Sequence, residues 1–153
     1  MLSKDEFKKV VEYAPLFAMD LVIINADKKV LLGKRNNSPA KGYWFVPGGR
    51  VFKNETLDQA FERISHDELG VSLERKNSKL LGLFDHFYDD SIFGSAVSTH
   101  YVNATHALHQ HIELSRLPKS QHQTYAWMSM DEMRERDDVH QYSKVFLDTL
   151  DGV

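Results

Sequence analysis

The chain has 153 residues, of which 42% are hydrophobic and 27% are charged, and these fractions are typical of folded globular domains and not of disordered chains. This length predicts one domain over residues 1–153. Cysteine is absent, which excludes disulfide bonds, and the formal net charge of −3 provides no basic field that would hold a nucleic-acid backbone. We therefore expect no nucleic-acid partner.

The apolar runs of the chain are short. The longest, at residues 16–24 and 30–32, fall well below the roughly 18 residues that a membrane-spanning helix needs. The N-terminal sequence MLSKDEFKKV lacks the apolar core and small-residue cleavage site of a secretory signal. We therefore expect no membrane insertion and a cytoplasmic protein.

The first predicted element is a helix at residues 5–13. It places Phe7, Val10 and Val11 at spacings of three and four residues, which is the pattern of an amphipathic helix. Pro15 follows and helps to end it.

Most of the other apolar stretches have the length and composition of strands, and the first two are separated by a short polar turn that favours a hairpin. These predicted strands lie at residues 17–24, 30–32, 43–46, 80–87, 97–107 and 125–128. Helical patterns at residues 55–69 and 139–150 complete the chain, with a glycine turn at Gly48 and Gly49 before the first of them. The natural architecture is a mixed sheet flanked by helices.

The predicted helix at residues 55–69, which ends at Gly70, has a carboxylate in its apolar stripe. Leu57, Phe61 and Ile64 gather on one face, and Glu68 falls within the same face. A carboxylate there needs a partner or a metal ion, because burying an isolated charge is costly. The alternative is that the helix rotates or frays at its end and leaves Glu68 in water.

The segment GGRVFKNETLDQAFERISHDELGV resembles the Nudix box. Matching positions are Gly49, Glu55, Arg63, Glu68, Gly70 and Val71, whereas Ile64 replaces the first glutamate of the core, Ser65 its aliphatic residue, and Asp67 stands for a further glutamate. The resemblance implies an α/β fold of the Nudix type, with a mixed β-sheet sandwiched between helices. It also implies that Arg63 and Glu55 form a structural ion pair.

Further segments are similar to one Nudix subfamily, the GDP-mannose mannosyl hydrolases: GKRNNSPAKGYWFVPGGRV, DHFYDD, THYV and the Gln121-His122 pair. This resemblance implies hydrolysis of GDP-mannose, and of similar GDP-hexoses such as GDP-glucose, to GDP and free sugar. Water would attack the anomeric carbon and invert it. The resemblance also implies a homodimer, with the N-terminal helix and strand at the subunit contact.

The same resemblance implies one Mg²⁺ per subunit, for which Mn²⁺ can substitute. Its ligands would be the Gly48 carbonyl and the side-chain oxygens of Glu68 and Gln121, an oxygen-only set that suits a hard cation. Because Ile64 replaces a carboxylate, fewer metal ions are expected than in other Nudix enzymes. His122 would be the general base, since a histidine pKa of about 6.5 suits proton abstraction near neutral pH.

The remaining implied site residues contact the substrate. Asp20 would contact the sugar, while Arg35 and Arg50 would neutralise the departing GDP, a task for which guanidinium groups are suited. His86 and Tyr101 would be additional diphosphate contacts. Asp20 could instead point to solvent through strand alternation.

Two other functions remain open. A conventional Nudix pyrophosphohydrolase would yield GMP and a sugar 1-phosphate, with Asp67 compensating for the lost glutamate. A non-catalytic sensor would bind a sugar nucleotide without using His122. The residues 117–120 also depart from the subfamily, which leaves the sugar preference open.

Two groups of side chains have a plainer interpretation. His106, His109 and His111 could suggest a transition-metal site, but exposed histidines on an edge strand are the favoured interpretation. The aromatic residues Trp44, Phe45 and Trp127 are expected in the core.

Overall fold

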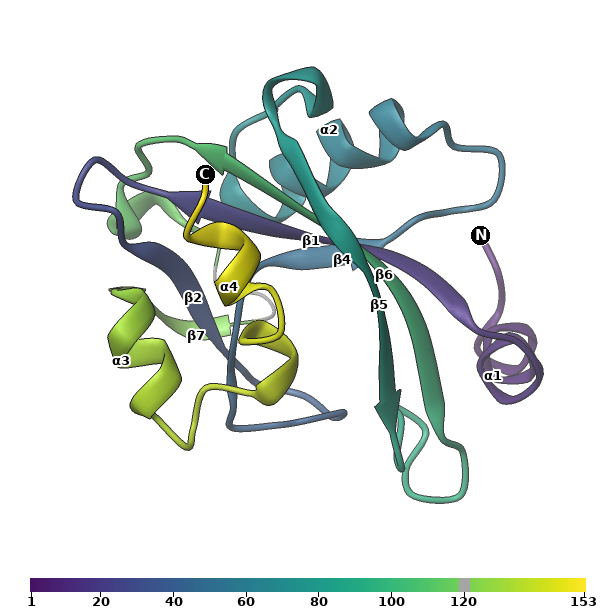
Figure 1. Ribbon diagram of the computed structural model, residues 1–153. Helices are drawn as coiled ribbons and strands as arrows, with labels where there is room; N and C mark the ends of the chain where they lie inside the picture. The colour runs from purple at the N-terminus through teal and green to yellow at the C-terminus, as the bar shows by residue number, and fades with distance from the viewer. Residues whose placement is uncertain (119–121) are drawn as a thin grey trace.

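The structure is a computed structural model that describes residues 1–118 and 122–153, with residues 122 and 123 described by their backbone alone. The chain runs from α1 through four strands to α2, and then through three strands to α3 and α4 (Figure 1). The helices are α1 (Lys4–Tyr13), α2 (Leu57–Leu69), α3 (Met130–Glu135) and α4 (Leu147–Leu150). The strands are β1 (Leu16–Ile24), β2 (Val30–Arg35), β3 (Trp44–Phe45), β4 (Gly48–Arg50), β5 (Lys79–Tyr88), β6 (Thr99–His109) and β7 (His122–Met128).

The strands form one mixed sheet, as the sequence predicts. Its main path runs in the order β3-β2-β1-β6-β5, with β4 paired to β1 and β7 paired to β2. β1 and β6 are parallel, and the other pairs are antiparallel. The predicted hairpin is present, because Ile24 of β1 pairs with Val30 of β2.

β1 divides its pairing between two strands. Its first half pairs with β4, where Asp20 stands opposite Gly48, and its last residue pairs with β2. β6 runs along the whole of its other edge. β1 therefore joins the segment that carries the glycines to the centre of the sheet.

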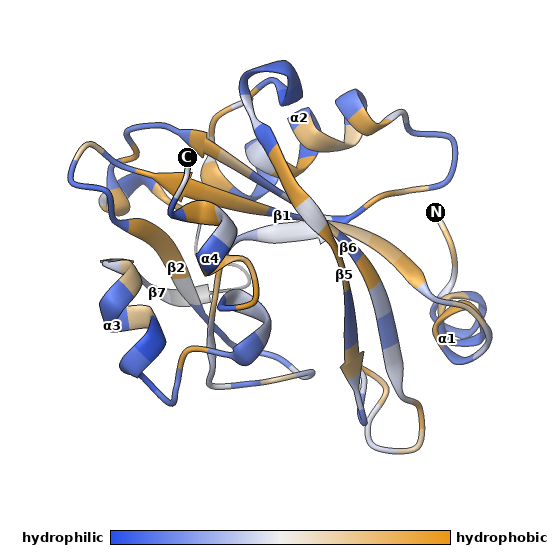
Figure 2. Ribbon diagram, viewed as in Figure 1, coloured by the Kyte–Doolittle hydropathy of each residue, from blue (hydrophilic) through white to orange (hydrophobic). Residues whose placement is uncertain are grey.

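The two faces of the sheet carry separate apolar clusters. Met19, Leu21 and Ile23 of β1 pack with α2 on one face. Val22 and Ile24 pack with α3 and α4 on the other face. Figure 1 shows α2 and α4 on opposite sides of β1, and Figure 2 shows that β1 and β2 are mostly hydrophobic. Strand alternation thus assigns neighbouring residues of β1 to different layers.

α2 begins and ends at residues with capping chemistry. The Thr56 hydroxyl accepts a hydrogen bond from the Gln59 backbone, and the Gln59 side chain accepts one from the Thr56 backbone. Gly70 ends the helix in the left-handed conformation with φ of 72°. Phe61 and Ile64 are fully buried, so this part of the predicted apolar stripe faces the sheet. Leu57, at the start of the helix, is 41% exposed, so its predicted place in the buried stripe is wrong.

α1 is capped in the same manner by Ser3 and Glu6. Its apolar side packs with Leu16 of β1 and with Val97, and Val11 is the buried residue of the helix. The helix predicted at residues 5–13 is therefore confirmed, with a start one residue earlier.

Two sequence predictions for local structure are wrong. The glycine turn is the strand β4, because its backbone pairs with β1. The final helix predicted at residues 139–150 is divided into a 3₁₀ turn (Gln141–Ser143) and the short α4. The buried hydroxyl of Ser143 accepts a hydrogen bond from the Val46 backbone at 3.1 Å, which fixes this segment against the sheet.

The interpretation of the three histidines also needs correction. β6 lies between β1 and β5, so it is not an edge strand. His106 is buried with its ring edge-on to Phe61, whereas His109 is exposed. Within residues 1–118 and 122–153, no group of three or more His, Cys, Asp or Glu side chains could hold a metal ion. Within the same described residues, no helix is long and apolar enough to cross a bilayer.

Candidate active site

A pocket with a volume of about 230 Å³ lies where β1, β5 and β6 meet the segment that contains β3 and β4. It brings together every sequence-predicted site residue whose side chain or glycine backbone the structure describes. These are Asp20, Arg35, Gly48, Arg50, Glu68, His86 and Tyr101. Residues separated by as many as 81 positions in the sequence thus line one cavity.

Two predicted site residues fall in or beside the part that is not fully described. Gln121 lies outside the described residues. The backbone of His122 begins β7 and pairs with Arg35, which lines the pocket. The register of β7 on β2 therefore brings the chain at His122 to the side of the pocket.

Asp20 lines the pocket, so the alternative that strand alternation turns it to solvent is wrong. Asn103 hydrogen-bonds its carboxylate, and the amide oxygen of Asn103 accepts a bond from the Thr105 hydroxyl at 2.9 Å. This bond leaves the Asn103 NH₂ group to donate to Asp20. Burial raises the pKa of Asp20 to about 7, because removal of water disfavours the charged carboxylate.

The backbone at Gly48 lies so close to Met19 and Asp20 that there is no space for a side chain. A Cβ atom at this position would lie 2.6 Å from the Met19 carbonyl oxygen and would also collide with the Asp20 carboxylate. The Gly48 N–H donates to Glu68 Oε1 at 3.3 Å. The absence of a side chain therefore lets β4 pass between Asp20 and Glu68.

Glu68 belongs to the last turn of α2 and is only 7% exposed. The turn remains helical, since the Gly70 N–H bonds to the His66 carbonyl at 2.9 Å. The alternative in which fraying leaves Glu68 in water is therefore wrong. Glu68 lines the pocket, while Phe61 and Ile64 of the same stripe stay in the core.

The donors at this end of the pocket fit a hard divalent cation such as Mg²⁺ or Mn²⁺. Glu68 provides a buried carboxylate, and the side-chain-free Gly48 brings backbone oxygen within the same pocket. Carboxylate and carbonyl oxygens are the ligands that such ions prefer.

Arg35 is held by the loop that follows β2. Its Nε donates to the carbonyl oxygens of Pro39 at 3.0 Å and Asn37 at 3.4 Å. The guanidinium lies 5.7 Å from the centre of the Phe45 ring. The loop thus fixes the base of the guanidinium and leaves its outer nitrogens for the pocket.

Arg50 is held between two aromatic rings. Its guanidinium carbon lies 4.2 Å from the Phe7 ring centre of α1 and 5.0 Å from the Phe52 ring centre. Burial lowers the pKa of Arg50, while nearby Tyr101 opposes that shift. Arg50 therefore brings a positive charge to a pocket whose wall includes a phenol.

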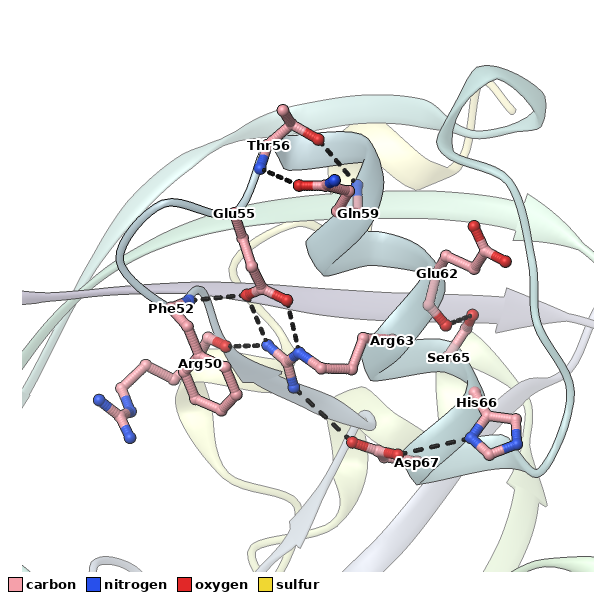
Figure 3. A network of polar contacts seen from close by, with 10 residues as sticks. All are labelled: Arg50, Phe52, Glu55, Thr56, Gln59, Glu62, Arg63, Ser65, His66 and Asp67. Carbon is pink, nitrogen blue, oxygen red and sulfur yellow. Dashed lines mark hydrogen bonds and ion pairs between the residues drawn. The ribbon is translucent and has the colours of Figure 1, made fainter. Parts of the chain in front are cut away.

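The predicted ion pair between Arg63 and Glu55 is confirmed and is shown in Figure 3. Arg63 Nε and Nη2 donate to the two Glu55 carboxylate oxygens at 2.6 and 2.9 Å. Arg63 Nη2 also donates to the Arg50 carbonyl at 2.7 Å, and Glu55 accepts from the Phe52 backbone. The pair therefore ties α2 to the chain that follows β4.

Asp67 does not line the pocket. Its side chain is 59% exposed and forms a 3.7 Å ion pair with Arg63 Nη1 (Figure 3). α2 directs Glu68 and Asp67 to different sides, because consecutive helical residues are about 100° apart. Asp67 therefore does not take the place of the carboxylate that Ile64 replaces.

His86 lines the pocket and has a buried ring nitrogen. The residue is 4% exposed, and Nε2 has no hydrogen-bond partner within the described residues. Burial, followed by the nearby His140, lowers the pKa of His86 to about 4. His86 is therefore neutral near pH 7.

The sequence analysis missed Asn103 and Tyr88, which also line the pocket. Alternation along residues 99–105 places Asn103 on the same face as Tyr101, so this pattern could have revealed it. Trp44 and Phe45 are buried as expected, although Phe45 also lines the pocket, and Trp127 is half-buried.

Two curated proteins are similar to this chain. The low-salt glycan biosynthesis protein Agl8 of Haloferax volcanii is 48% identical over 101 residues, which make up 66% of this chain and 63% of that protein. The ADP-ribose pyrophosphatase of Methanocaldococcus jannaschii is 40% identical over 85 residues, which make up 55% of this chain and 48% of that protein. The chain thus spans less than two thirds of either relative.

Among solved structures, the MutT protein from Methanosarcina mazei Go1 has a TM-score of 0.74 at 19% sequence identity, covering 90% of this chain and 94% of that chain. This likeness shows the mixed α/β fold of Nudix hydrolases. The sequence family described as the NUDIX domain matches residues 15–150. Sequence and fold agree over nearly the whole chain, which therefore belongs to the Nudix hydrolase family.

Proposed function

We propose that this protein hydrolyses GDP-mannose, and similar GDP-hexoses such as GDP-glucose, to GDP and free sugar. The observation that carries the proposal is the orientation of α2. Glu68 is the α2 carboxylate that lines the pocket, whereas Asp67 points to solvent and Ile64 is buried. The helix therefore offers one carboxylate for metal binding and none beside it to activate water at phosphorus.

A different base is then required, and His122 is the candidate. Its backbone stands opposite Arg35 in the β2–β7 pairing. An imidazole there suits removal of a proton from water that attacks the anomeric carbon and inverts it. The raised pKa of Asp20 and its Asn103 partner support a hydrogen bond from this side chain to a sugar hydroxyl.

Departure of GDP requires neutralisation of negative charge. Arg35 and Arg50 both line the pocket and act electrostatically on Tyr101, which lies in the same wall. Gly48, Glu68 and Gln121 would hold a Mg²⁺ ion, which would supply further charge neutralisation. His86 contributes a neutral hydrogen-bonding nitrogen.

The relatives support a nucleotide-sugar substrate, and one of them bears on the bond that is broken. The Haloferax volcanii relative is named as a glycan biosynthesis protein, which supports a sugar nucleotide as the substrate. The Methanocaldococcus jannaschii relative is an ADP-ribose pyrophosphatase, which favours the second candidate, cleavage of the diphosphate to GMP and sugar 1-phosphate.

Phosphorus NMR of the products from GDP-mannose and Mg²⁺ separates these reactions. We expect GDP and mannose, with ¹⁸O from labelled water in the mannose. GMP with mannose 1-phosphate would instead establish diphosphate cleavage and would contradict the role assigned to Ile64. No turnover of GDP-mannose or GDP-glucose would favour a different substrate or a binding role.

We also propose a homodimer. The sheet face that α2 leaves uncovered presents Phe17, Leu83 and Phe87, which are 36%, 62% and 60% exposed. Tyr13 at the end of α1 is exposed as well. Exposed apolar side chains gathered on one face are suited to a subunit interface. Light scattering after size exclusion should give twice the chain mass, and Leu83→Asp should reduce it.

A further inference from the structure

The most closely stacked pair of rings beside the pocket is formed by His86 and Tyr142. Their ring centres are 4.4 Å apart and their planes differ by 7°. Tyr142 lies in the 3₁₀ turn Gln141–Ser143, which crosses the sheet near the C-terminus. This contact therefore joins the C-terminal segment to a pocket residue that is 56 positions earlier in the chain.

The Tyr142 hydroxyl is anchored to the strand that carries His86. It accepts a hydrogen bond from the Phe87 N–H and donates one to the Phe87 carbonyl, both at 2.9 Å. β5 is at the end of the sheet path, so the outward backbone groups of Phe87 have no neighbouring strand. Tyr142 satisfies both groups and thereby fixes its ring over His86.

A second contact fixes the backbone of Tyr142. Its N–H donates to His140 Nδ1 at 3.1 Å, and the His140 ring stacks on Phe45 with a centre distance of 4.6 Å. Phe45 itself lines the pocket. Tyr142 is thus held at its hydroxyl by β5 and at its backbone by the pocket wall.

His86 is the group that this arrangement constrains. His86 lines the pocket, and its Nε2 is buried and has no partner within the described residues. An unpaired buried nitrogen costs free energy of folding, and such groups persist where a ligand completes them. A ligand can complete Nε2 only if the His86 ring keeps one orientation. A neighbouring group must therefore prevent the ring from rotating.

We propose that Tyr142 is a positioning residue that holds the His86 imidazole flat against its ring, so that Nε2 points into the pocket and bonds to the bound substrate. The identity of that substrate rests on the proposed function above. Tyr142 holds the His86 ring in this orientation before any substrate binds.

The charged and titratable groups around His86 are Asp85 on β5, Tyr101 opposite it on β6, and His140 and Tyr142 from the C-terminal segment. Burial is the main cause that lowers the pKa of His86 to about 4, and His140 adds to it. The Tyr142 ring provides part of that burial. Removal of the ring should therefore admit water and raise the His86 pKa.

Nitrogen-15 NMR of the histidine rings in the full chain without substrate or metal tests the proposal, with His86→Gln used to assign the His86 signals. Tyr142→Leu should raise the His86 pKa by about one unit or more towards its usual value of about 6.5. Tyr142→Phe keeps the ring but loses both bonds to Phe87, so we expect a smaller rise. Tyr43→Leu is the matched control, because Tyr43 contacts His140 and not His86.

Unchanged His86 signals in folded Tyr142→Leu would overturn the proposal, as would an equal change in Tyr43→Leu. If Tyr142→Leu fails to fold, Tyr142→Phe decides, and unchanged His86 signals in it would overturn the role of the hydroxyl anchor.

Turnover of GDP-mannose provides a separate measurement. We expect kcat/KM to fall about 10- to 100-fold in Tyr142→Leu, because a displaced contact weakens the transition state. Inactive wild-type protein would overturn the proposed function. The NMR result would still decide whether Tyr142 positions the His86 ring.

Discussion

Gly49 of β4 lies directly on Ile64 of α2. A Cβ atom at Gly49 would be 3.0 Å from Ile64 Cγ1, and Ile64 is only 1% exposed. The position where the Nudix box has its first core glutamate is therefore part of the apolar core in this protein. Because this position is buried beneath β4, its side chain cannot serve as a metal ligand.

Ile64→Glu should be strongly destabilising. The new carboxylate would lie under Gly49 without water or a partner, and burial of an unpaired charge is costly. We expect the free energy of unfolding to fall by about 4 kcal/mol or more, or the chain not to fold. Urea unfolding measures the change, and Ile64→Val is the control, with an expected loss of about 1 kcal/mol. Equal stability of Ile64→Glu and wild type would mean that α2 can turn this position to the pocket.

Glu68→Gln should separate metal binding from folding. Glutamine keeps the oxygen that accepts from the Gly48 N–H but loses the negative charge. The Mg²⁺ concentration for half-maximal activity should rise about tenfold or more, with little change in Tm measured without metal. Glu62→Gln, on the exposed side of α2, is the control. A normal metal titration with a lowered Tm would make Glu68 purely structural.

His122→Ala should reduce kcat by about 10² to 10⁴ if His122 is the general base. The change should leave the thermal unfolding curve unaltered, because the alanine keeps the β7 backbone that pairs with Arg35. His109→Ala, at the exposed end of β6, should turn over at the wild-type rate. A wild-type rate in His122→Ala would remove His122 from the mechanism.

The Arg63–Glu55 pair should contribute measurably to stability. Its side chains are 28% and 17% exposed, and charge-assisted double hydrogen bonds of this kind are stronger than surface ion pairs. A double-mutant cycle of Arg63→Met and Glu55→Gln should give a coupling of about 1 to 3 kcal/mol. The Arg75–Asp58 pair, with side chains 36% and 75% exposed, serves as the comparison and should give less than about 1 kcal/mol. Equal couplings would mean that burial adds nothing to the Arg63 pair.

His140 should make stability depend on pH. Burial, and then the charge of Arg35, lowers its pKa to about 4, below the value of about 6.5 expected in the unfolded chain. As pH falls, the unfolded chain binds the proton first, so this contribution is full above about pH 6.5 and is lost as pH falls towards 4.

The loss should be about 1 to 2 kcal/mol, because His140 is half-buried and its charge is partly screened. Urea unfolding of wild type and His140→Phe between pH 7.5 and 4.5 measures it, since the difference between the two curves removes the carboxylates common to both. His111→Phe, at an exposed site, is the control. Parallel curves for wild type and His140→Phe would contradict the prediction.

Much of the fold could be predicted because it depends on local pattern. The buried residues of α2, its end at Gly70 and the apolar run of β1 follow from residues that are close in the sequence. The division of the C-terminal segment could not be predicted, since Ser143 is placed by a bond to Val46, 97 positions earlier.

The same distinction holds for the candidate site. Glu68 could be found from helical periodicity, and the other site residues came from motif resemblance. Asn103 could also have been found, because strand alternation places it on the same face as Tyr101. Tyr142 could not, since its partner Phe87 is 55 positions earlier and no spacing in the sequence connects them.

In the first half of β1, residues that line the pocket alternate with residues that pack in the core. Ala18 and Asp20 face the pocket, while Met19 and Leu21 face α2. A slip of one residue would exchange the two sets. A chain that has buried Met19 has therefore already oriented Asp20, so the strand cannot be correctly folded with its part of the pocket unassembled. An insertion or deletion within β1 is accordingly expected to abolish folding and activity together, whereas one in the turn after Ile24 can spare both.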